Sequence, residues 1–411
     1  MYLKRITTAL ALTAALPVLS AQATDLEVTH WWTSGGEAAA VGEFAKAFDA
    51  TGNKWVDGAI AGGGGTARPI MVSRLIGGDP MGAFQFNHGR QAEELIEAGL
   101  LRDLTDVAEA NGWKDIIYPS SLLDSCTVDG RIYCAPVNIH SWQWLWLSNS
   151  AFEKAGVAVP SNWDEFVAAS GALRDAGIQP LALGGQSWQS SGAFNVLMVA
   201  LAGPDALVDI YGNKNAELAA GDVMARVFKA AADARSMAEG SSVQDWNQAT
   251  NLVITDQAGG QIMGDWAQGE FQVAGEVAGE DYTCLPGLGV NELIDTAGDA
   301  FYFPIIDDAE IAAAQDELAN LMVSPEVQVS FNLKKGSLPI RGDVDLTAAN
   351  DCMKKGLEIL AAGNTLPAVT QLNTEDTNNQ LNDLFVEFFS DNSITPEAAQ
   401  ARFVDIVSSA E

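Results

Sequence analysis

The sequence predicts an α/β fold in two domains, and three observations support this prediction. Stretches with the periodicity of a strand alternate along the chain with stretches that have the periodicity of a helix, which is typical of α/β architecture with parallel or mixed sheets. The 411 residues exceed what one hydrophobic core usually serves. The sequence has no internal repeat and no long Pro/Ser-rich linker, so two lobes joined by short crossovers fit better than separate beads.

The first 23 residues have the features of a secretory signal peptide. Lys4 and Arg5 supply a positive start, residues 6–18 are mostly apolar, and Ala21 and Ala23 frame a small-residue cleavage site. The apolar run is too short for a membrane anchor, and no later segment approaches the length needed to span a bilayer. We therefore expect an exported, soluble, periplasmic chain of about 388 residues that begins after Ala23.

Periodicity predicts the remaining elements in order. Residues 26–32 alternate as a strand that ends in the pair Trp31 and Trp32. A helix follows, with one apolar face and a stop at Gly52; the face is formed by Val41, Phe44, Ala45 and Phe48. Further along, we expect a helix at 91–98 that ends at Gly99, a helix that starts near 160–166 with Ser161 or Asn162 as cap, a buried strand at 261–264, and helices at 316–322 and 325–333.

The four cysteines form an even set that suits an oxidising compartment. Cys126 and Cys134 flank a short hairpin with an Asp-Gly turn, which brings its ends together. Cys126–Cys134 and Cys284–Cys352 are therefore the favoured pairs among three possible connectivities. A zinc site is disfavoured, because the sequence has no Cys-x-x-Cys spacing and only three histidines.

The composition excludes several classes of partner. The formal net charge is −32, and it becomes −34 once Lys4 and Arg5 leave with the predicted signal peptide. Such a surface repels phosphate backbones and anionic lipid, so roles at nucleic acid or at a membrane surface are disfavoured. A hydrophobic content of 48% with 18% charged residues indicates a globular chain rather than a disordered one.

The motif at residues 30–37, HWWTSGGE, is the strongest candidate for a binding site. It places two flat apolar rings beside Glu37. A sugar offers a weakly apolar C–H face for stacking and a rim of hydroxyl donors, which suits this combination. The alternative is a Trp-Trp pair packed in a core, but neighbouring strand residues point to opposite faces, so one core does not easily take both.

Other motifs are less specific. The loop at residues 61–68, AGGGGTAR, lacks the Gly-Lys-Ser/Thr ending of a phosphate loop, and we interpret it as a turn where backbone approaches a ligand or the other lobe. Trp246 and Trp266 each stand beside an acid and are either stacking platforms or core residues. The alternating residues Trp142, Trp144 and Trp146 are typical of packing.

Machinery for breaking bonds is not evident in the sequence. No paired carboxylate motif stands out, and the serines lack a Gly-x-Ser-x-Gly elbow. His30, His88 and His140 are scattered and form no metal motif. The sequence therefore predicts aromatic recognition without catalysis, cofactor or metal.

Seven motifs, in this order along the chain, resemble those of the periplasmic sugar-binding proteins of ABC importers, the family 1 extracellular solute-binding proteins. The glucose-binding branch is the most similar. The motifs span nearly the whole mature chain: HWWTSGGE (30–37), VDGAIAGGGG (56–65), APVNIH (135–140), GGQSWQ (184–189), DWN (245–247), MGDWA (263–267) and FNLKKGSLPIR (331–341).

The resemblance implies a two-lobe α/β "Venus flytrap" whose hinge closes on one sugar. It implies that rings cover the sugar faces while carboxylates accept from hydroxyls and a lysine donates. The ligand residues that it implies are Trp31, Trp32, Glu37, Trp246, Asp299 and Lys335.

Two positions depart from the glucose-binding pattern. At residues 85–89, QFNHG, His88 stands where the family carries a lysine, with Gln85 or Asn87 nearby. At residues 368–371, AVTQ, a family histidine is missing. Both changes remove ligand donors, so galactose, mannose, a modified monosaccharide or a disaccharide stays open beside glucose.

The resemblance also implies discontinuous lobes and specific partners. We expect an N-terminal lobe of residues 24–133 plus 288–333 and a C-terminal lobe of residues 134–287 plus 334–411. The expected partners are a sugar and the permease subunits of an ABC importer, with the receptor itself a monomer and no nucleic acid bound. A secreted glycoside hydrolase or lyase is the alternative from another class, and a sensing receptor for chemotaxis would use the same fold.

Overall fold

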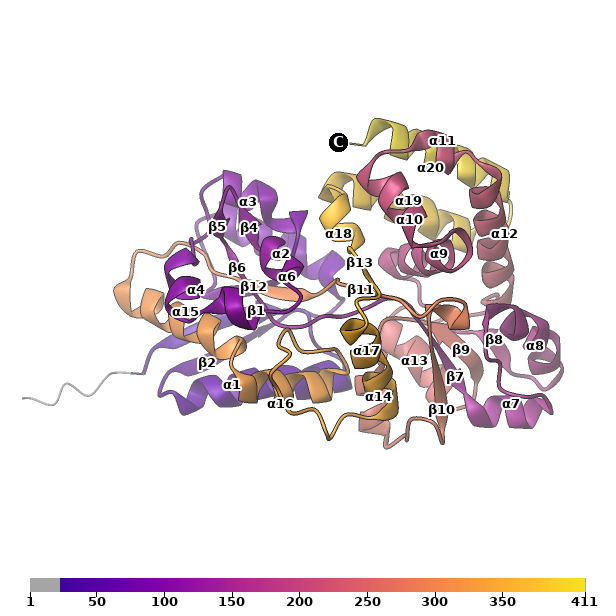
Figure 1. Ribbon diagram of the computed structural model, residues 1–411, viewed down its shortest axis with the longest axis horizontal. Helices are drawn as coiled ribbons and strands as arrows, with labels where there is room; N and C mark the ends of the chain where they lie inside the picture. The colour runs from indigo at the N-terminus through magenta and orange to yellow at the C-terminus, as the bar shows by residue number, and fades with distance from the viewer. Residues whose placement is uncertain (1–22, 411) are drawn as a thin grey trace, which may run out of the picture.

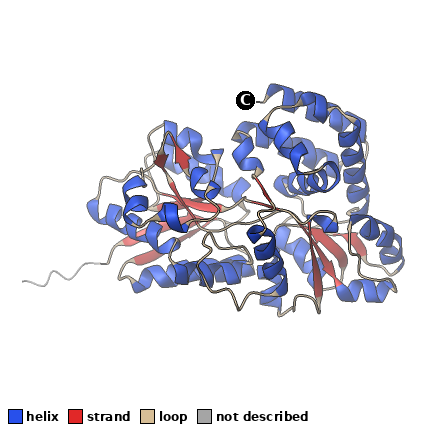
Figure 2. Ribbon diagram, viewed as in Figure 1, coloured by secondary structure: helices blue, strands red, loops and turns tan. Residues whose placement is uncertain are grey.

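The computed structural model describes residues 23–410, so nearly all of the predicted signal peptide lies outside the described residues. Two groups of strands, each flanked by helices, lie side by side along the long axis (Figures 1 and 2). This arrangement confirms the predicted two-lobe α/β fold. No helix within residues 23–410 combines the length and apolar character required to cross a bilayer.

A five-stranded mixed sheet forms the centre of the first lobe, in the order β2-β1-β3-β12-β6. Strand β1 pairs in parallel with β2 and β3, whereas β12 pairs antiparallel with β3 and β6. The strands are β1 (Asp25–His30), β2 (Lys54–Ala59), β3 (Ala83–Asn87), β6 (Cys134–Pro136) and β12 (Asp299–Tyr302). The other elements of this lobe are α1 (Gly35–Ala50), α2 (Gly64–Ile76), the 3-10 turn Arg90–Ala92, α3 (Glu93–Glu97), α4 (Thr105–Ala110), α5 (Trp113–Ile116), α6 (Ser121–Asp124), β4 (Thr127–Val128), β5 (Arg131–Ile132), α15 (Ala309–Met322) and α16 (Pro325–Lys335).

A four-stranded mixed sheet, in the order β10-β7-β9-β8, forms the centre of the second lobe. Its strands are β7 (Trp144–Ser148), β8 (Gln179–Leu181), β9 (Ala258–Ile262) and β10 (Tyr282–Pro286). The helical elements are α7 (Asn149–Ala155), α8 (Trp163–Asp175), α9 (Ser187–Ala202), α10 (Pro204–Leu207), the turn Val208–Gly212, α11 (Ala216–Ala219), α12 (Asp222–Met237), α13 (Trp246–Ile254), α14 (Ala267–Ala274), the turn Gly287–Gly289, α17 (Asp351–Ala361), α18 (Val369–Leu372), α19 (Glu375–Ser390) and α20 (Pro396–Ser409). Strand β6 lies in the range 134–287, which we expected to belong to this lobe. It pairs instead with β12 in the first sheet.

The predicted elements are present, with ends shifted by a few residues. Strand β1 ends at His30, so Trp31 and Trp32 follow the strand rather than forming its last residues. Helix α8 is capped by Asn162, whose side chain accepts a hydrogen bond from the backbone N–H of Glu165. The predicted helices near 41–48, 91–98, 316–322 and 325–333 are α1, α3, α15 and α16, and the predicted strand at 261–264 is β9.

Both predicted disulfides are present. Asp129 and Gly130 have φ angles of 51° and 77°, which form the tight turn between β4 and β5 and bring Cys126 close to Cys134. The other bridge joins Cys284 on β10 to Cys352 on α17, which are 68 residues apart. The long-range bridge therefore holds α17 against the second sheet.

Crossover segments between the lobes lie side by side and are tied by hydrogen bonds. Strands β11 (Ile294–Asp295) and β13 (Thr365–Leu366) pair in parallel there. The carboxylate of Asp295 accepts from the backbone N–H of Trp142 at 3.0 Å, and that of Asp265 accepts from Ser141 N at 3.0 Å. Buried acids thus fasten the crossover that leads into β7.

Loss of the Cys284–Cys352 bridge should destabilise the fold more than loss of Cys126–Cys134. All four cysteines are buried, but the bridges close chain segments of 68 and 8 residues. In the chain-entropy description of crosslinks, this difference is about 2 kcal/mol. Urea unfolding of the two double Cys→Ala variants measures both losses, and equal losses would contradict the expectation.

Replacement of Asp265 by Asn should increase stability progressively as pH rises. Burial raises the pKa of the Asp265 carboxyl well above its ordinary value, and the Ser141 N–H and the Lys335 charge oppose that rise only in part. An acid with a higher pKa in the folded than in the unfolded chain lowers the free energy of unfolding as pH rises through the folded pKa. Asn keeps the acceptor for Ser141 N and does not ionise.

Thermal unfolding between pH 4 and pH 8 tests this expectation. The difference in melting temperature between Asp265→Asn and the parent should grow with pH, and a constant difference would count against it. Asp343→Asn is a control with a pKa shift of opposite sign, because the surface pairing with Arg341 lowers the pKa of Asp343. The stability that Asp343 contributes is lost only as pH falls below about 4, so the difference between this variant and the parent should stay nearly constant over most of this range.

Candidate functional site

A cavity of about 540 Å³ lies between the two lobes. Its walls come from the turn after β1, the glycine-rich loop before α2, the crossovers, the first turns of α9 and α13, and helix α19. Six tryptophans line it: Trp31, Trp32, Trp142, Trp188, Trp246 and Trp266. The cavity therefore combines aromatic rings with polar and charged side chains.

Two buried side chains hold the Trp31–Trp32 turn by its backbone. His30 Nδ1 accepts from Trp32 N at 3.3 Å, and Gln85 Oε1 accepts from Trp31 N at 3.0 Å. These bonds satisfy the two N–H groups where the chain leaves the sheet. Trp31 is half-buried in the cavity wall, whereas Trp32 is 1% exposed. The Trp32 ring also packs in the core, against Phe44, Phe301 and Phe331.

A buried ion pair between Glu37 and Lys335 forms the charged centre of the cavity. Lys335 Nζ donates to Glu37 Oε1 at 3.2 Å, and Ser34 Oγ, at the start of α1, donates to Glu37 Oε2 at 3.1 Å. Burial raises the pKa of Glu37, and the Lys335 ammonium opposes that rise. An ammonium has three N–H donors, so the contact with Glu37 leaves donors for a ligand.

Asp299, at the start of β12, is a buried carboxylate of the cavity that accepts hydrogen bonds from three side chains. Gln85 Nε2 donates to Oδ1 at 2.8 Å, while Asn138 Nδ2 and His140 Nδ1 lie 3.0 and 3.1 Å from Oδ2. Burial alone would raise the pKa of Asp299, but His140, Lys335 and Asn138 outweigh it and lower the pKa to about 2. Asp299 is therefore a fixed acceptor at neutral pH.

A cluster of tryptophans centred on Trp266 forms the opposite wall. Its ring meets Trp142 and Trp246 edge-on, with centroids 5.0 and 6.4 Å apart, and Trp188 at 6.3 Å. Edge-to-face contact fixes ring orientation. The sequence left Trp246 and Trp266 open between stacking and core, and both line the cavity. Trp142 packs against both hydrophobic cores, as the packing interpretation expects, and also lines the cavity.

The glycine-rich loop contacts the other lobe across the cavity mouth, as predicted. Gly62 and Gly63 have φ angles of 104° and 73°, a backbone conformation that side chains other than glycine rarely adopt. Gln186 Nε2, from the turn before α9, donates to Gly62 O at 3.3 Å. Arg68 on α2 also pairs with Glu375 on α19 at 3.0 Å. These contacts hold the lobes close together.

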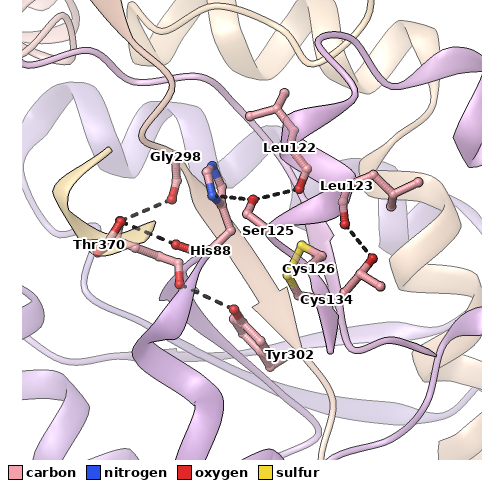
Figure 3. Close-up of a disulfide and its surroundings, with 11 residues drawn as sticks. His88, Leu122, Leu123, Ser125, Cys126, Cys134, Gly298, Tyr302 and Thr370 are labelled. Carbon is pink, nitrogen blue, oxygen red and sulfur yellow. Dashed lines mark hydrogen bonds between the residues drawn. A yellow bond between two sulfur atoms is a disulfide. The ribbon is translucent and has the colours of Figure 1, made fainter. Parts of the chain in front are cut away.

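Of the residues at the first sequence departure, Asn87 lines the cavity, whereas Gln85 and His88 lie behind its wall. His88 is fully buried, and its ring bonds to Ser125 at 2.8 Å (Figure 3). Burial and the nearby His140 lower the pKa of His88 to about 3, so its ring is neutral. Thr370 Oγ1 donates to His88 O at 3.4 Å, so the two departures from the glucose-binding pattern contact each other.

The predicted residues Trp31, Trp32, Glu37, Trp246, Asp299 and Lys335 all line one cavity. Sequence reasoning did not assign Trp188, Gln186, Arg68 or the α19 residues to it. Trp188 and Gln186 were within a quoted motif, GGQSWQ, whereas the signal in α19 is a polar helical face. Within residues 23–410, no three His, Cys, Asp or Glu side chains are arranged to hold a metal ion.

The chain is similar to proteins of one family over most of its length. Residues 32–329 match the model for bacterial extracellular solute-binding proteins. A probable sugar-binding periplasmic protein of Brucella melitensis biotype 1 is 38% identical over 364 residues, which cover 87% of this chain and 85% of the relative. A protein of the same description from Rhizobium meliloti is 37% identical over 362 residues, with 87% and 86% covered.

Solved structures agree in fold. A chitin oligosaccharide binding protein superposes with a TM-score of 0.76 at 21% identity, covering 94% of this chain and 99% of that one. The bacterial solute receptor AcbH, described with an exclusive preference for β-D-galactopyranose, gives 0.76 at 18% identity, covering 93% and 98%. From the family match and the relatives at 37–38% identity, the chain belongs to the bacterial extracellular solute-binding proteins.

Proposed function

We propose that this chain is a periplasmic receptor that binds a sugar between its lobes and delivers it to the permease subunits of an ABC importer. The observation that carries the proposal is the combination of tryptophan rings with the buried groups Glu37, Lys335 and Asp299 around one cavity. Rings cover the C–H faces of a sugar, and charged groups form strong hydrogen bonds to its hydroxyls. The descriptions of the Brucella and Rhizobium relatives support the same class of ligand.

The proposed ligand contacts are Trp31, Trp32, Glu37, Asn87, Trp246, Asp299 and Lys335. Gln85 and His88 support this wall from behind. Glucose or a related hexose is the first candidate for the unit that occupies the charged end, because the motifs resemble the glucose-binding branch. Opening of the lobes would release the ligand, and the receptor would act as a monomer that leaves the sugar chemically unchanged.

Glu37→Gln and Trp31→Ala should each weaken sugar binding, by roughly tenfold to a hundredfold. The first change removes the charge that strengthens hydrogen bonds to hydroxyls, and the second removes the stacking surface; each loss is about 1–3 kcal/mol. Calorimetry with D-glucose, D-galactose, D-mannose and their disaccharides measures the change. Trp32→Ala is a poor test, because Trp32 is also a core residue and its truncation costs about 3–5 kcal/mol of stability.

The controls separate loss of binding from loss of fold. Glu310→Gln changes an exposed acid outside the cavity lining and should bind as the parent does.

Recovery of the sugar after incubation, by chromatography, tests for turnover. Shorter products would favour the hydrolase or lyase alternative, and no binding by any sugar would reject the proposal.

Gln85→Met should weaken sugar binding although Gln85 does not line the cavity. The amide accepts from Trp31 N and donates to Asp299, so its loss releases both the aromatic turn and the fixed acceptor. We expect a loss of affinity of about tenfold, comparable to one lost hydrogen bond to a charged group. Calorimetry with the tightest-binding sugar of the panel measures it.

Gln315→Met is the matched control. Gln315 is equally buried in the same lobe, and its amide donates to Gly82 O and Pro304 O away from the cavity. Both variants should lower the melting temperature, but only Gln85→Met should lower affinity. Equal affinities in the two variants would show that Gln85 has no positioning role.

A further inference from the structure

Helix α19 presents a polar face to the cavity. The cavity-lining residues on this helix are spaced by three and four positions, which places them on one face: Glu375, Asn378, Asn379, Asn382 and Asp383. The opposite face is buried in the second lobe, where Phe385 stacks on Phe194 with centroids 4.0 Å apart. We call the cavity-lining set the α19 polar face.

The asparagines of this face do not stabilise the helix. Asparagine is among the poorer helix formers, because its amide competes with the backbone for hydrogen bonds. In the described part of the chain, the amides of Asn379 and Asn382 bond to no other residue, and Asn378 Oδ1 has only a 3.4 Å contact with Asn373. Asn379 is exposed and Asn378 and Asn382 are half-buried, so their amides line the cavity and keep donor and acceptor groups for a ligand that displaces water.

Contacts across the cleft place the α19 polar face close to Trp31. A methyl group on Gly64 would lie 2.8 Å from Arg68 Nη1 and 3.4 Å from the Trp31 ring, so Arg68 lies beside Trp31. Arg68 in turn pairs with Glu375 at 3.0 Å. Asn195 on α9 also lines the cavity; its Oδ1 accepts from Tyr211, which leaves its NH₂ group for a ligand.

The cavity is larger than one hexose requires. A hexose displaces roughly six waters, or about 180 Å³ at ~30 Å³ per water. The cavity volume of about 540 Å³ is several times that figure. A single hexose would therefore leave much of the cavity unfilled.

We propose that the α19 polar face and Asn195 form a second subsite, which binds the hydroxyls of a further sugar unit. The ligand is then an uncharged di- or trisaccharide rather than a monosaccharide. Amides suit neutral hydroxyls, and the charges at this end disfavour an acidic sugar, because Arg68 is already paired while Asp383 is negative. This inference rests on the proposed function and specifies its ligand.

The double variant Asn379→Ala/Asn382→Ala tests the second subsite. Alanine is the better helix former, so the variant should fold with an unchanged or higher melting temperature. Calorimetry compares D-glucose, D-galactose and D-mannose with maltose, cellobiose, lactose and maltotriose. The tightest di- or trisaccharide should bind the parent at least tenfold more tightly than the tightest monosaccharide.

In the variant, affinity for that longer sugar should fall at least tenfold, while affinity for the monosaccharide stays within twofold. Gln380→Ala is the matched control on the same helix, because Gln380 is exposed and outside the cavity lining. A monosaccharide that binds as tightly as every longer sugar, or a variant that changes both affinities equally or neither, would overturn the second subsite. Failure of all sugars to bind would instead reject the proposed function.

Discussion

The carboxylate of Asp299 is the interaction on which the rest of the site depends. It accepts from Gln85 on β3 and from Asn138 and His140 on the segment between β6 and β7. Gln85 also accepts a hydrogen bond from Trp31 N, so it connects Asp299 to the aromatic turn. Asn138 and His140 lie on the crossover between the lobes. One buried anion thus aligns the aromatic wall, the first sheet and the crossover, because each donor keeps its bond only while it stays in place relative to Asp299.

The buried carboxyls Asp299 and Asp265 respond differently to burial. Asp299 stays ionised with a pKa of about 2, because His140, Lys335 and Asn138 compensate for burial. At Asp265, burial dominates and the pKa rises. The pKa values of these two buried carboxyls are therefore shifted in opposite directions, because more donors face Asp299 than Asp265.

The six tryptophans of the cavity are arranged so that packing and recognition share the same rings. Trp32 contacts the core phenylalanines and also lines the cavity, and Trp266 meets Trp142 and Trp246 edge-on. Rings that are fixed before a ligand arrives lose little conformational freedom on binding. Helix α19 also combines packing with a surface for binding, because one face packs in the core and the other lines the cavity.

Sequence by itself determined the features that depend on local pattern: the alternation of strands and helices, the Asp-Gly hairpin between Cys126 and Cys134, and the aromatic motif with Glu37. Its resemblance to a known family also brought Asp299 and Lys335 into the site. Tertiary structure decided which side chains reach the cavity. Gln85 and His88 lie behind the wall, and Trp142 and α19 form part of it, because the direction of each side chain depends on contacts between segments far apart in the chain.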